Sequence, residues 1–331
     1  MGLQAQSRLC RPRQLRGPDA LRAQHADAAA DHADRHRRHR PVTGRAPAPG
    51  RGADLLVTAI APIVWGTTYI VTTQWLPPDR PLAVSALRAL PAGLLLLAIV
   101  RILPDRTWAG RVFLLGALNF ALFWALLFVS VYRLPGGVAA TLGAIQPLIV
   151  LVLERLLIGS PIRPAQLVVG LMGVAGVGLL VLTPRAALDA LGLAAGFGAA
   201  AAMAAGTTLS KLWRPPASPL AFTAWQLSAG GLLLAPLALL VEGPPPALTP
   251  TNLAALAWLG LIGAALTYML WFRGLARLPP STVAPLALLS PVVATLIGVA
   301  ALGESLTAPQ WLGMAVALGA VWLNARLALR G

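Results

Sequence analysis

The stretch "GAIQPLIVLVLERLLIGS", Gly143–Ser160, returns in altered form as "ALLSPVVATLIGVAALGE", Ala287–Glu304. Each copy contains a polar residue followed by proline, then an apolar run and a glycine. A proline inside an apolar run removes a backbone hydrogen bond and bends a helix. Because both copies carry this feature at the same place, the pattern indicates an internal duplication.

Three further pairs of segments keep a similar separation along the chain. The four offsets are 140, 138, 144 and 144 residues, in sequence order. Apolar composition alone rarely produces such a steady offset, so the pairs support the duplication. The further pairs are "WGTT" from Trp65 and "AGTT" from Ala205, "PLAVSALRALPAGLLLL" from Pro81 and "PLAFTAWQLSAGGLLLA" from Pro219, and "LNFALFWALLFVSVYRLP" from Leu118 and "IGAALTYMLWFRGLARLP" from Ile262.

The composition places the chain in a membrane. Of its 331 residues, 57% are hydrophobic and 11% are charged, whereas soluble domains carry about 25% charged residues. Ten apolar stretches are each long enough to cross a hydrocarbon core of about 30 Å as a helix, and the alternating strands of a membrane barrel are not seen. We predict an all-α polytopic membrane protein with ten transmembrane helices, near residues 55–75, 82–102, 111–132, 136–157, 164–183, 189–210, 219–241, 253–273, 281–301 and 308–328.

The first 53 residues differ from the rest of the chain. They are rich in Arg, Ala, Pro and His and lack apolar periodicity, which favours a disordered basic tail. Binding of anionic lipid, nucleic acid or a metal by this tail is the alternative, and we expect no nucleic-acid partner. From Ala53 onward there is neither His nor Cys, so neither a disulfide nor a His- or Cys-based metal site is expected there, and no cofactor is expected.

Basic residues are distributed unevenly over the connections between the apolar stretches. With a cytoplasmic N-terminus, eleven basic residues fall at inner connections and three at outer ones. Cytoplasmic loops carry an excess of Lys and Arg, so both termini are expected in the cytoplasm. The inner residues are Arg101, Arg106, Arg111, Arg155, Arg163, Lys211, Arg214, Arg273, Arg277, Arg326 and Arg330, and the outer ones are Arg80, Arg133 and Arg185.

Five spans per repeat is an odd number, and this has a geometric consequence. The second repeat must enter the membrane in the opposite direction, which gives two inverted five-helix repeats, residues 54–185 and 186–331. Inverted repeats related by an axis in the membrane plane are typical of secondary transporters. The duplicated sequence therefore favours two related halves that rock about a shared central site.

Three segments resemble a known family: "WGTTYIV" from Trp65, "SALRALPAGLLLL" from Ser85 and "LGESLTAPQWLGMAVALGAVWL", Leu302–Leu323. They look like EamA-type proteins of the drug/metabolite transporter superfamily, and the resemblance covers both repeats. It implies a ten-helix inverted-repeat fold and export of amino acids, metabolites or drugs across the bacterial inner membrane. The first repeat has Gly159-Ser160 where the family often has Gly-Glu, which counts against a role that needs an acidic residue in both repeats.

Aromatic and neutral polar side chains within the spans are the predicted substrate contacts. Small-molecule sites combine apolar walls with a few polar groups, and we place this site between the repeats near the midplane. Helix packing is the alternative for each residue, since Thr can bond back to its own helix. The set is Trp65, Thr67, Thr68, Asn119, Trp124, Gln146, Thr207, Thr208 and Tyr268.

Two prolines and three charged residues within the spans have competing interpretations. Pro147 and Pro291 are expected to kink the fourth and ninth helices and so expose backbone groups to substrate, or else to serve packing only. Arg88 joins the predicted substrate contacts because a charge inside a span costs about 2.5–3.5 kcal/mol.

The alternative for Arg88 is a side chain that reaches the interface and pairs with Asp79 or a lipid phosphate. Glu154 is expected to form an ion pair beside Arg155 at the cytoplasmic interface, with proton coupling as the alternative. Glu304 either ties the outer loop to the tenth helix or acts in gating.

Secondary-active transport by alternating access is the function that these features favour. The alternative is a non-transport membrane protein, either an enzyme or an assembly scaffold. We expect no enzyme, because the spans contain no His, no paired acids on one helix face and no phosphate-binding glycine loop. The expected partners are a small-molecule substrate and the lipid bilayer, while a coupling proton and a second copy of the chain stay open.

Reporter fusions test the predicted topology. A reporter at Gly331 and one in the loop near Glu242 should report opposite sides of the membrane, because an odd number of spans separates them. Alkaline phosphatase, active outside, and green fluorescent protein, fluorescent inside, provide complementary readouts. The same side for both positions would rule out the ten-span arrangement.

Overall fold

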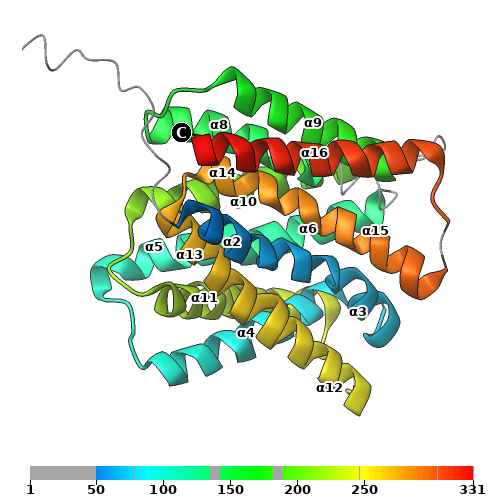
Figure 1. Ribbon diagram of the computed structural model, residues 1–331. Coiled ribbons are helices and arrows are strands. Elements are labelled where there is room, and N and C mark those ends of the chain that lie inside the picture. Colours follow the sequence, from blue (N-terminus) through cyan, green and yellow to red (C-terminus); the bar gives the residue numbers. More distant parts are fainter. Residues whose placement is uncertain are drawn as a thin grey trace, which may run out of the picture. The chain divides into compact units, whose positions relative to one another are not determined.

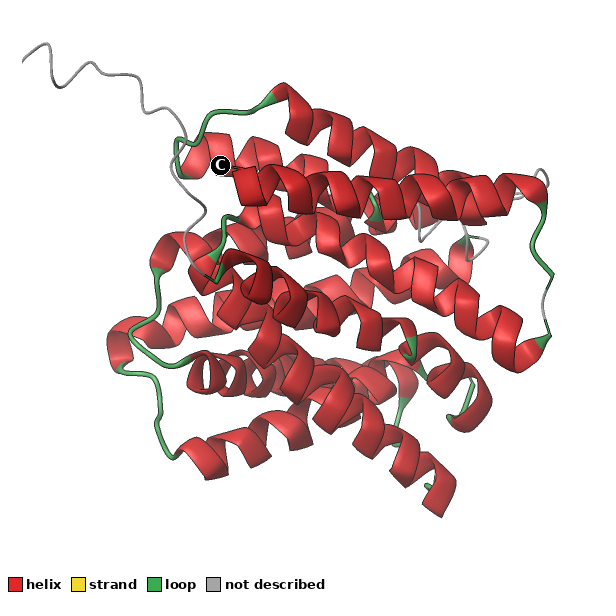
Figure 2. Ribbon diagram, in the orientation of Figure 1, coloured by secondary structure: helices red, strands yellow, loops and turns green. Residues whose placement is uncertain are grey.

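The computed structural model describes residues 50–78, 80–134, 142–181, 189–245, 247–303 and 305–330. All of these residues belong to one compact unit, Pro47–Gly331. Within them, helices are joined by short connections and no strand is present (Figure 2). The tail predicted over residues 1–53 lies outside the described residues up to Pro49.

Eight helical segments of the described chain are long and apolar enough to cross a membrane. The chain is therefore an all-helical polytopic membrane protein. The fifth predicted span corresponds to a shorter apolar helix, and only the second part of the fourth is described, so the count of ten stays a prediction. The eight segments are Arg51–Trp75, Pro81–Val100, Arg106–Ser130, Ala190–Trp213, Pro219–Glu242, Pro250–Arg277, Pro280–Leu302 and Ala308–Arg330.

Several of these segments consist of two or three consecutive helical elements (Figure 1). In chain order the elements are α2 (Arg51–Gly66), α3 (Thr68–Trp75), α4 (Pro81–Val100), α5 (Arg106–Gly116), η1 (Ala117–Ala121), α6 (Leu122–Arg133), α8 (Gln146–Leu157), α9 (Pro164–Val181), α10 (Ala190–Trp213), α11 (Pro219–Glu242), α12 (Pro250–Ala257), η2 (Trp258–Leu266), α13 (Thr267–Arg277), α14 (Pro280–Val283), η3 (Ala284–Leu288), α15 (Leu289–Leu302) and α16 (Ala308–Arg330).

Local sequence explains where many of these helices begin. Ser218 and Thr249 each precede a proline, and their hydroxyls accept hydrogen bonds from N–H groups in the first turns of α11 and α12. Asp105 and Asp189 accept from the first turns of α5 and α10 in the same way. Short polar side chains satisfy N–H groups that have no partner within a helix, and proline fits the first turn because it has no N–H.

The structure refines the predicted role of the two repeated prolines. Pro147 lies in the first turn of α8, and Pro291 is the third residue of α15. A turn precedes α8, and the 3₁₀ segment η3 precedes α15. Each proline thus lies in the first turn of its α-helix, directly after a stretch of different helical or turn geometry, where it removes no hydrogen bond that the α-helix would otherwise make. The kink itself stays a prediction.

Helices that the sequence pairs as repeats pack directly on each other. Helix α4 packs along α11, and α9 packs along α16 (Figure 1). By the repeat offsets, α2 corresponds to α10, α6 to α13 and α8 to α15. The contact of α2 with α13 has its counterpart in that of α10 with α6. The contact of α2 with α15 likewise has its counterpart in that of α10 with α8. The π-helical segments η1 and η2 also occupy corresponding places, between α5 and α6 and between α12 and α13.

Glycines allow close approaches between these helices, and the contact between α4 and α11 is one of them. A Cβ atom on Gly93 would lie 2.5 Å from the backbone nitrogen of Ser228, and one on Gly231 would lie 2.6 Å from the Cα atom of Leu90. In both helices the backbone therefore occupies space that any other residue would need for its side chain. Small residues at helix contacts permit such close packing within membranes.

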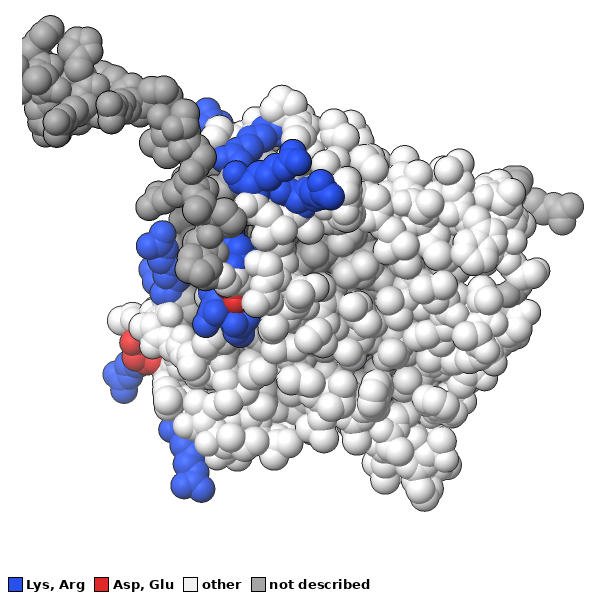
Figure 3. All heavy atoms as spheres, in the orientation of Figure 1, with Lys and Arg blue, Asp and Glu red and all other residues white. Residues whose placement is uncertain are grey.

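Charged groups gather at one end of the helices. In the face shown in Figure 3, Lys and Arg lie at the end where α16 finishes. The Arg51 Nη1 donates a hydrogen bond of 3.2 Å to the Ala328 carbonyl, so the start of α2 meets the end of α16. Asp54 pairs with Arg273 at 2.9 Å and with Arg277 at 3.0 Å. The first and last described helices thus begin and end on the same side.

Replacement of Gly93 by alanine should destabilise the protein, because the methyl group collides with the α11 backbone. Overpacking of this kind typically lowers the free energy of unfolding by about 1–3 kcal/mol. We expect a loss of similar size for Gly231→Ala. Thermal unfolding of the purified protein in detergent measures the effect. Gly110→Ala is the matched control, since no atom lies within 4 Å of its Cβ position. Equal stability of the Gly93 and Gly110 variants would contradict the close crossing.

Candidate functional site

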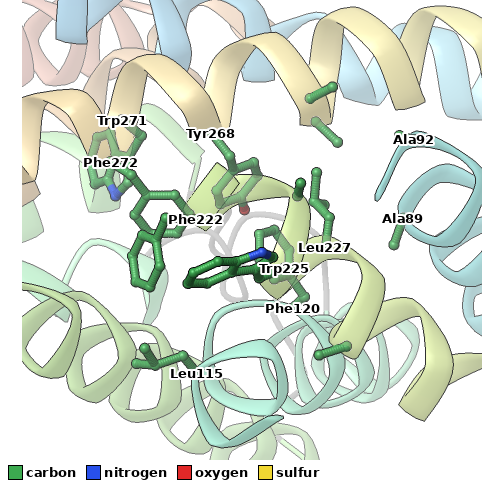
Figure 4. Packing of buried hydrophobic residues seen from close by; sticks show 14 of the residues in the cluster. Ala89, Ala92, Leu115, Phe120, Phe222, Trp225, Leu227, Tyr268, Trp271 and Phe272 are labelled. Atoms are coloured by element: carbon green, nitrogen blue, oxygen red, sulfur yellow. The ribbon is translucent and has the colours of Figure 1, made fainter. Parts of the chain in front are cut away.

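Five aromatic side chains from distant parts of the chain meet in the core. The Trp65 ring of α2 has its centroid 5.0 Å from that of Tyr268 and 5.1 Å from that of Trp271, both in α13. The Phe120 ring of η1 lies 4.5 Å from Tyr268 and 5.3 Å from Trp124 of α6. Figure 4 shows Tyr268 directed toward Phe120, with Trp271 farther along the same helix. We call Trp65, Phe120, Trp124, Tyr268 and Trp271 the aromatic cluster; its tilted and edge-on contacts are those that aromatic rings prefer.

Arg88 of α4 places a cation against this cluster. Its guanidinium carbon lies 4.2 Å from the centroid of the Trp124 ring, and 7% of the residue is exposed. Its Nε is buried and has no hydrogen-bond partner among the described residues. No described carboxylate pairs with it. A cation–π contact contributes about 2 kcal/mol or more when desolvated, so the buried charge is compensated only in part.

A buried pair of amides lies beside the aromatic cluster. The Asn119 Nδ2 donates a hydrogen bond of 2.7 Å to the Gln226 Oε1 and lies 3.4 Å from the Ser210 hydroxyl. The Asn119 Oδ1 and the Gln226 Nε2 are buried without a partner among the described residues. A Cβ on Gly206 would overlap the Asn119 amide. The pair thus keeps one acceptor and one donor unused in a tightly packed environment, where an unmade hydrogen bond is costly.

Trp65 and Thr67 make different polar contacts although they are close in sequence. The Trp65 Nε1 donates to the Thr267 hydroxyl at 2.9 Å, which links α2 to α13 beside the aromatic cluster. The Thr67 hydroxyl instead accepts from the Trp258 Nε1 at 3.1 Å and donates to the Val64 carbonyl. Thr67 lines an apolar cavity of about 500 Å³ between α3, α12 and α15, together with Ile70, Val71, Trp75, Thr251, Ala254, Ala255, Trp258 and Ile297.

The other predicted contacts are spread over the bundle. The Thr208 hydroxyl donates to the Ala204 carbonyl in its own helix, as in the packing alternative, whereas the Thr207 hydroxyl is buried without a described partner. Gln146 begins α8, and its Nε2 is also buried and unpartnered. Thr68 begins α3.

A second cavity, of about 260 Å³, lies at the end where charged groups gather, and Arg51, Glu154, Arg163 and Asn324 are among its lining residues. No ion pair joins Glu154 to its neighbour Arg155. The buried Glu154 carboxylate instead accepts from the Ser281 backbone N–H at 2.9 Å, and Arg155 donates to the Gly159 carbonyl. The carboxylate thus holds the start of α14 against α8.

Comparison with known proteins identifies the family. The model of the EamA-like transporter family matches the chain twice, over residues 53–182 and 190–326. The chain belongs to the EamA-like transporter family. It is therefore a membrane transporter.

Individual relatives of this EamA-like transporter span most of its length. Protein PecM of Dickeya dadantii is 45% identical over 77% of this chain and 86% of its own. The uncharacterized transporter YwfM of Bacillus subtilis is 32% identical over 79% of this chain and 90% of its own length. The uncharacterized inner membrane transporter YedA of Escherichia coli K12 is 27% identical over 79% of this chain and 87% of its own length. A crystal structure of a protein with 20% identity superposes with a TM-score of 0.71 over 83% of this chain and 97% of the other, which shows a shared fold.

The structure of the EamA-like transporter brings four predicted residues together: Trp65, Arg88, Trp124 and Tyr268. Asn119 directly precedes Phe120, whose ring contacts Trp124 and Tyr268. Thr67 faces the apolar cavity instead. Glu304 and Asp79 lie outside the described residues. The binding role of each residue stays a prediction.

Sequence analysis missed several residues that complete the cluster. Phe120 precedes Trp124 by four positions and Thr267 precedes Trp271 by four, so each pair shares one helix face. This periodicity was the available signal. Gln226 occupies the position equivalent to Arg88 in the second repeat, 138 residues later. Its partner Asn119 lies 107 positions away, a contact that no local pattern reveals.

A double-mutant cycle should detect the buried amide pair of this transporter. Asn119→Leu and Gln226→Leu each leave one amide unpaired, so the double variant should lose less stability than the two single losses combined. Hydrogen bonds between membrane helices average about 0.6 kcal/mol and reach about 1.7 kcal/mol. Chemical unfolding in detergent gives the coupling energy, and additive losses would show that the amides do not interact.

Proposed function

We propose that this EamA-like transporter is a secondary-active exporter of the bacterial inner membrane that moves small metabolites, amino acids or drugs by alternating access. The observation that carries the proposal is the composition of the aromatic cluster. Trp65, Phe120 and Trp124 precede residue 185, whereas Tyr268 and Trp271 follow it. A cluster built from both halves is disrupted and rebuilt when the halves move relative to each other, as a central transport site requires.

Ten spans arranged as inverted repeats, residues 54–185 and 186–331, are part of the proposal. The two family matches over 53–182 and 190–326 support it. Corresponding close contacts also support it: Gly116 packs on the Gln226 carbonyl, and Gly260 packs on the Arg88 carbonyl. Gly116 and Gly260 are equivalent residues 144 positions apart, and Arg88 and Gln226 are equivalent residues 138 positions apart. A two-fold axis that relates the repeats generates such reciprocal contacts.

The proposed location has both termini in the cytoplasm. The relative YedA is named an inner membrane transporter. The contact between Arg51 and the Ala328 carbonyl brings the described ends of the bundle to one side, in agreement with an even number of spans. The gathering of Lys and Arg at this side favours its being cytoplasmic (Figure 3).

A membrane enzyme or an assembly scaffold is the alternative function. Neither requires a buried aromatic and polar cluster shared by two equivalent halves. Among the described residues, no group of three or more His, Cys, Asp or Glu that could hold a metal ion is found. We propose transport without a cofactor, driven by an ion gradient such as that of protons.

Accumulation of a labelled metabolite panel in inverted membrane vesicles tests this proposal. Vesicles with the transporter should accumulate at least one compound beyond vesicles without it, and collapse of the proton gradient shows whether protons are coupled. Trp65→Ala and Gln146→Leu should reduce this accumulation at unchanged membrane levels, because they remove an apolar wall and a buried polar group.

Trp311→Ala is the matched control, since Trp311 is 55% exposed on α16 and away from the aromatic cluster. It should leave accumulation unchanged. Equal losses in the Trp65 and Trp311 variants would contradict a central site. Accumulation of no compound from a broad panel would favour the non-transport alternative.

A further inference from the structure

We propose that the substrate is an organic monoanion whose carboxylate binds Arg88, with a flat apolar body held by the aromatic cluster. The inference rests on the proposed transport function and adds the charge of the substrate to it. It selects against cationic drugs and against zwitterionic amino acids as substrates. The juxtaposition that carries it is a buried guanidinium stacked on Trp124 within an aromatic cluster that has no described carboxylate.

The described carboxylates are all engaged elsewhere. Asp54 pairs with Arg273 and Arg277 at one end of the bundle. Glu154 accepts from the Ser281 N–H. Glu242 accepts from the N–H groups of Leu82 and Ala83, at 2.7 and 2.8 Å. Asp105 and Asp189 accept from the first turns of α5 and α10.

A buried arginine without an anion is an unusual arrangement. Charged side chains inside membrane spans normally pair with each other or line a functional pathway. The Trp124 face compensates one side of the guanidinium, but its Nε remains unpartnered. The Nε and one terminal nitrogen form the edge that binds a carboxylate through two parallel hydrogen bonds. A substrate carboxylate on this edge supplies both the missing charge and the missing acceptor.

The surroundings indicate the remainder of the substrate. The rings of Trp65, Phe120, Trp124 and Tyr268 offer flat apolar surfaces that suit a ring or an unsaturated chain. The Asn119–Gln226 pair has one unused acceptor and one unused donor, both uncharged. These amides suit a neutral polar substituent, whereas a substrate ammonium has no described carboxylate to bind and is repelled by Arg88.

The two repeats differ at this position, and the difference gives the site a direction. Arg88 and Gln226 are equivalent residues, 138 positions apart, as are Trp124 and Tyr268, 144 positions apart. One half thus offers a cation stacked on an aromatic ring, and the other offers an uncharged amide that is hydrogen-bonded to Asn119. A monoanion with one polar end fits such a polarised site in a single orientation, with its carboxylate toward α4.

Ligand sets that share a ring system and differ in charge test the inference. Phenylacetate, phenylacetamide, phenethylamine and phenylalanine share a ring but are anionic, neutral, cationic and zwitterionic; indole-3-acetate, its amide, tryptamine and tryptophan form a larger set. Equilibrium binding to the purified full chain in lipid nanodiscs is measured by ligand-induced thermal stabilisation. In at least one set the anion should bind at least tenfold more tightly than the other three members.

Arg88→Gln should remove this preference and weaken anion binding roughly tenfold to hundredfold, as expected for loss of a charge-assisted hydrogen bond. Arg88→Lys keeps the charge but loses the two-point contact, so it should restore part of the preference. Arg111→Gln is the matched control: Arg111 also lies over tryptophan rings, 5.2 Å from Trp108 and 5.4 Å from Trp213, but is exposed. It should bind like the unaltered protein.

Equal binding of all charge forms, or binding of no anion in either set, overturns the inference, and both results come from the unaltered protein. Unchanged anion binding in folded Arg88→Gln also overturns it. These measurements need no transport. Anion binding through Arg88 without uptake in reconstituted vesicles would therefore leave the inference standing and reject the proposed function, whereas uptake that is indifferent to charge and to Arg88 would do the reverse.

Discussion

The close contact between α4 and α11 is the constraint on which the core of this protein depends. Within a bilayer the lipid is as apolar as the helices, so packing rather than the hydrophobic effect holds helices together. Gly93 and Gly231 let the two backbones touch. Arg88 and Gln226 each precede one of these glycines by five residues, so the crossing fixes both side chains relative to the aromatic cluster.

Tight packing buries the polar groups of the core, and a buried polar group without a hydrogen-bond partner is costly. Arg88, Asn119 and Gln226 each retain a buried atom that has no described hydrogen-bond partner. Two of the residues involved, Asn119 and Phe120, belong to η1, and Tyr268 closely follows η2. Segments of π-helix are frequent at functional sites. The irregular backbone of two equivalent helices thus coincides with the chemistry that we assign to substrate binding.

Individual side chains, rather than family membership or fold, determine which substrate such a protein binds. The solved structure with a TM-score of 0.71 shares only 20% of the sequence, and one fold commonly serves several functions. Arg88 is the residue that most narrows the choice, because an uncompensated cation restricts the charge of any ligand beside it. The apolar cavity along α3 and the cavity beside Glu154 lie on other elements, so they do not alter this restriction.

The sequence by itself determined the helical class, the duplicated segments and the uneven placement of basic residues, because these follow from composition and periodicity along one chain. It also drew attention to Trp65, Arg88, Trp124 and Tyr268. Only the tertiary structure decided that these four meet, that Asn119 bonds to Gln226, and that Glu154 caps α14 rather than pairing with Arg155. Most of these contacts join residues more than a hundred positions apart, and all of them join different helices. The relative rotation and depth of packed helices, which set such contacts, are not encoded in any local pattern.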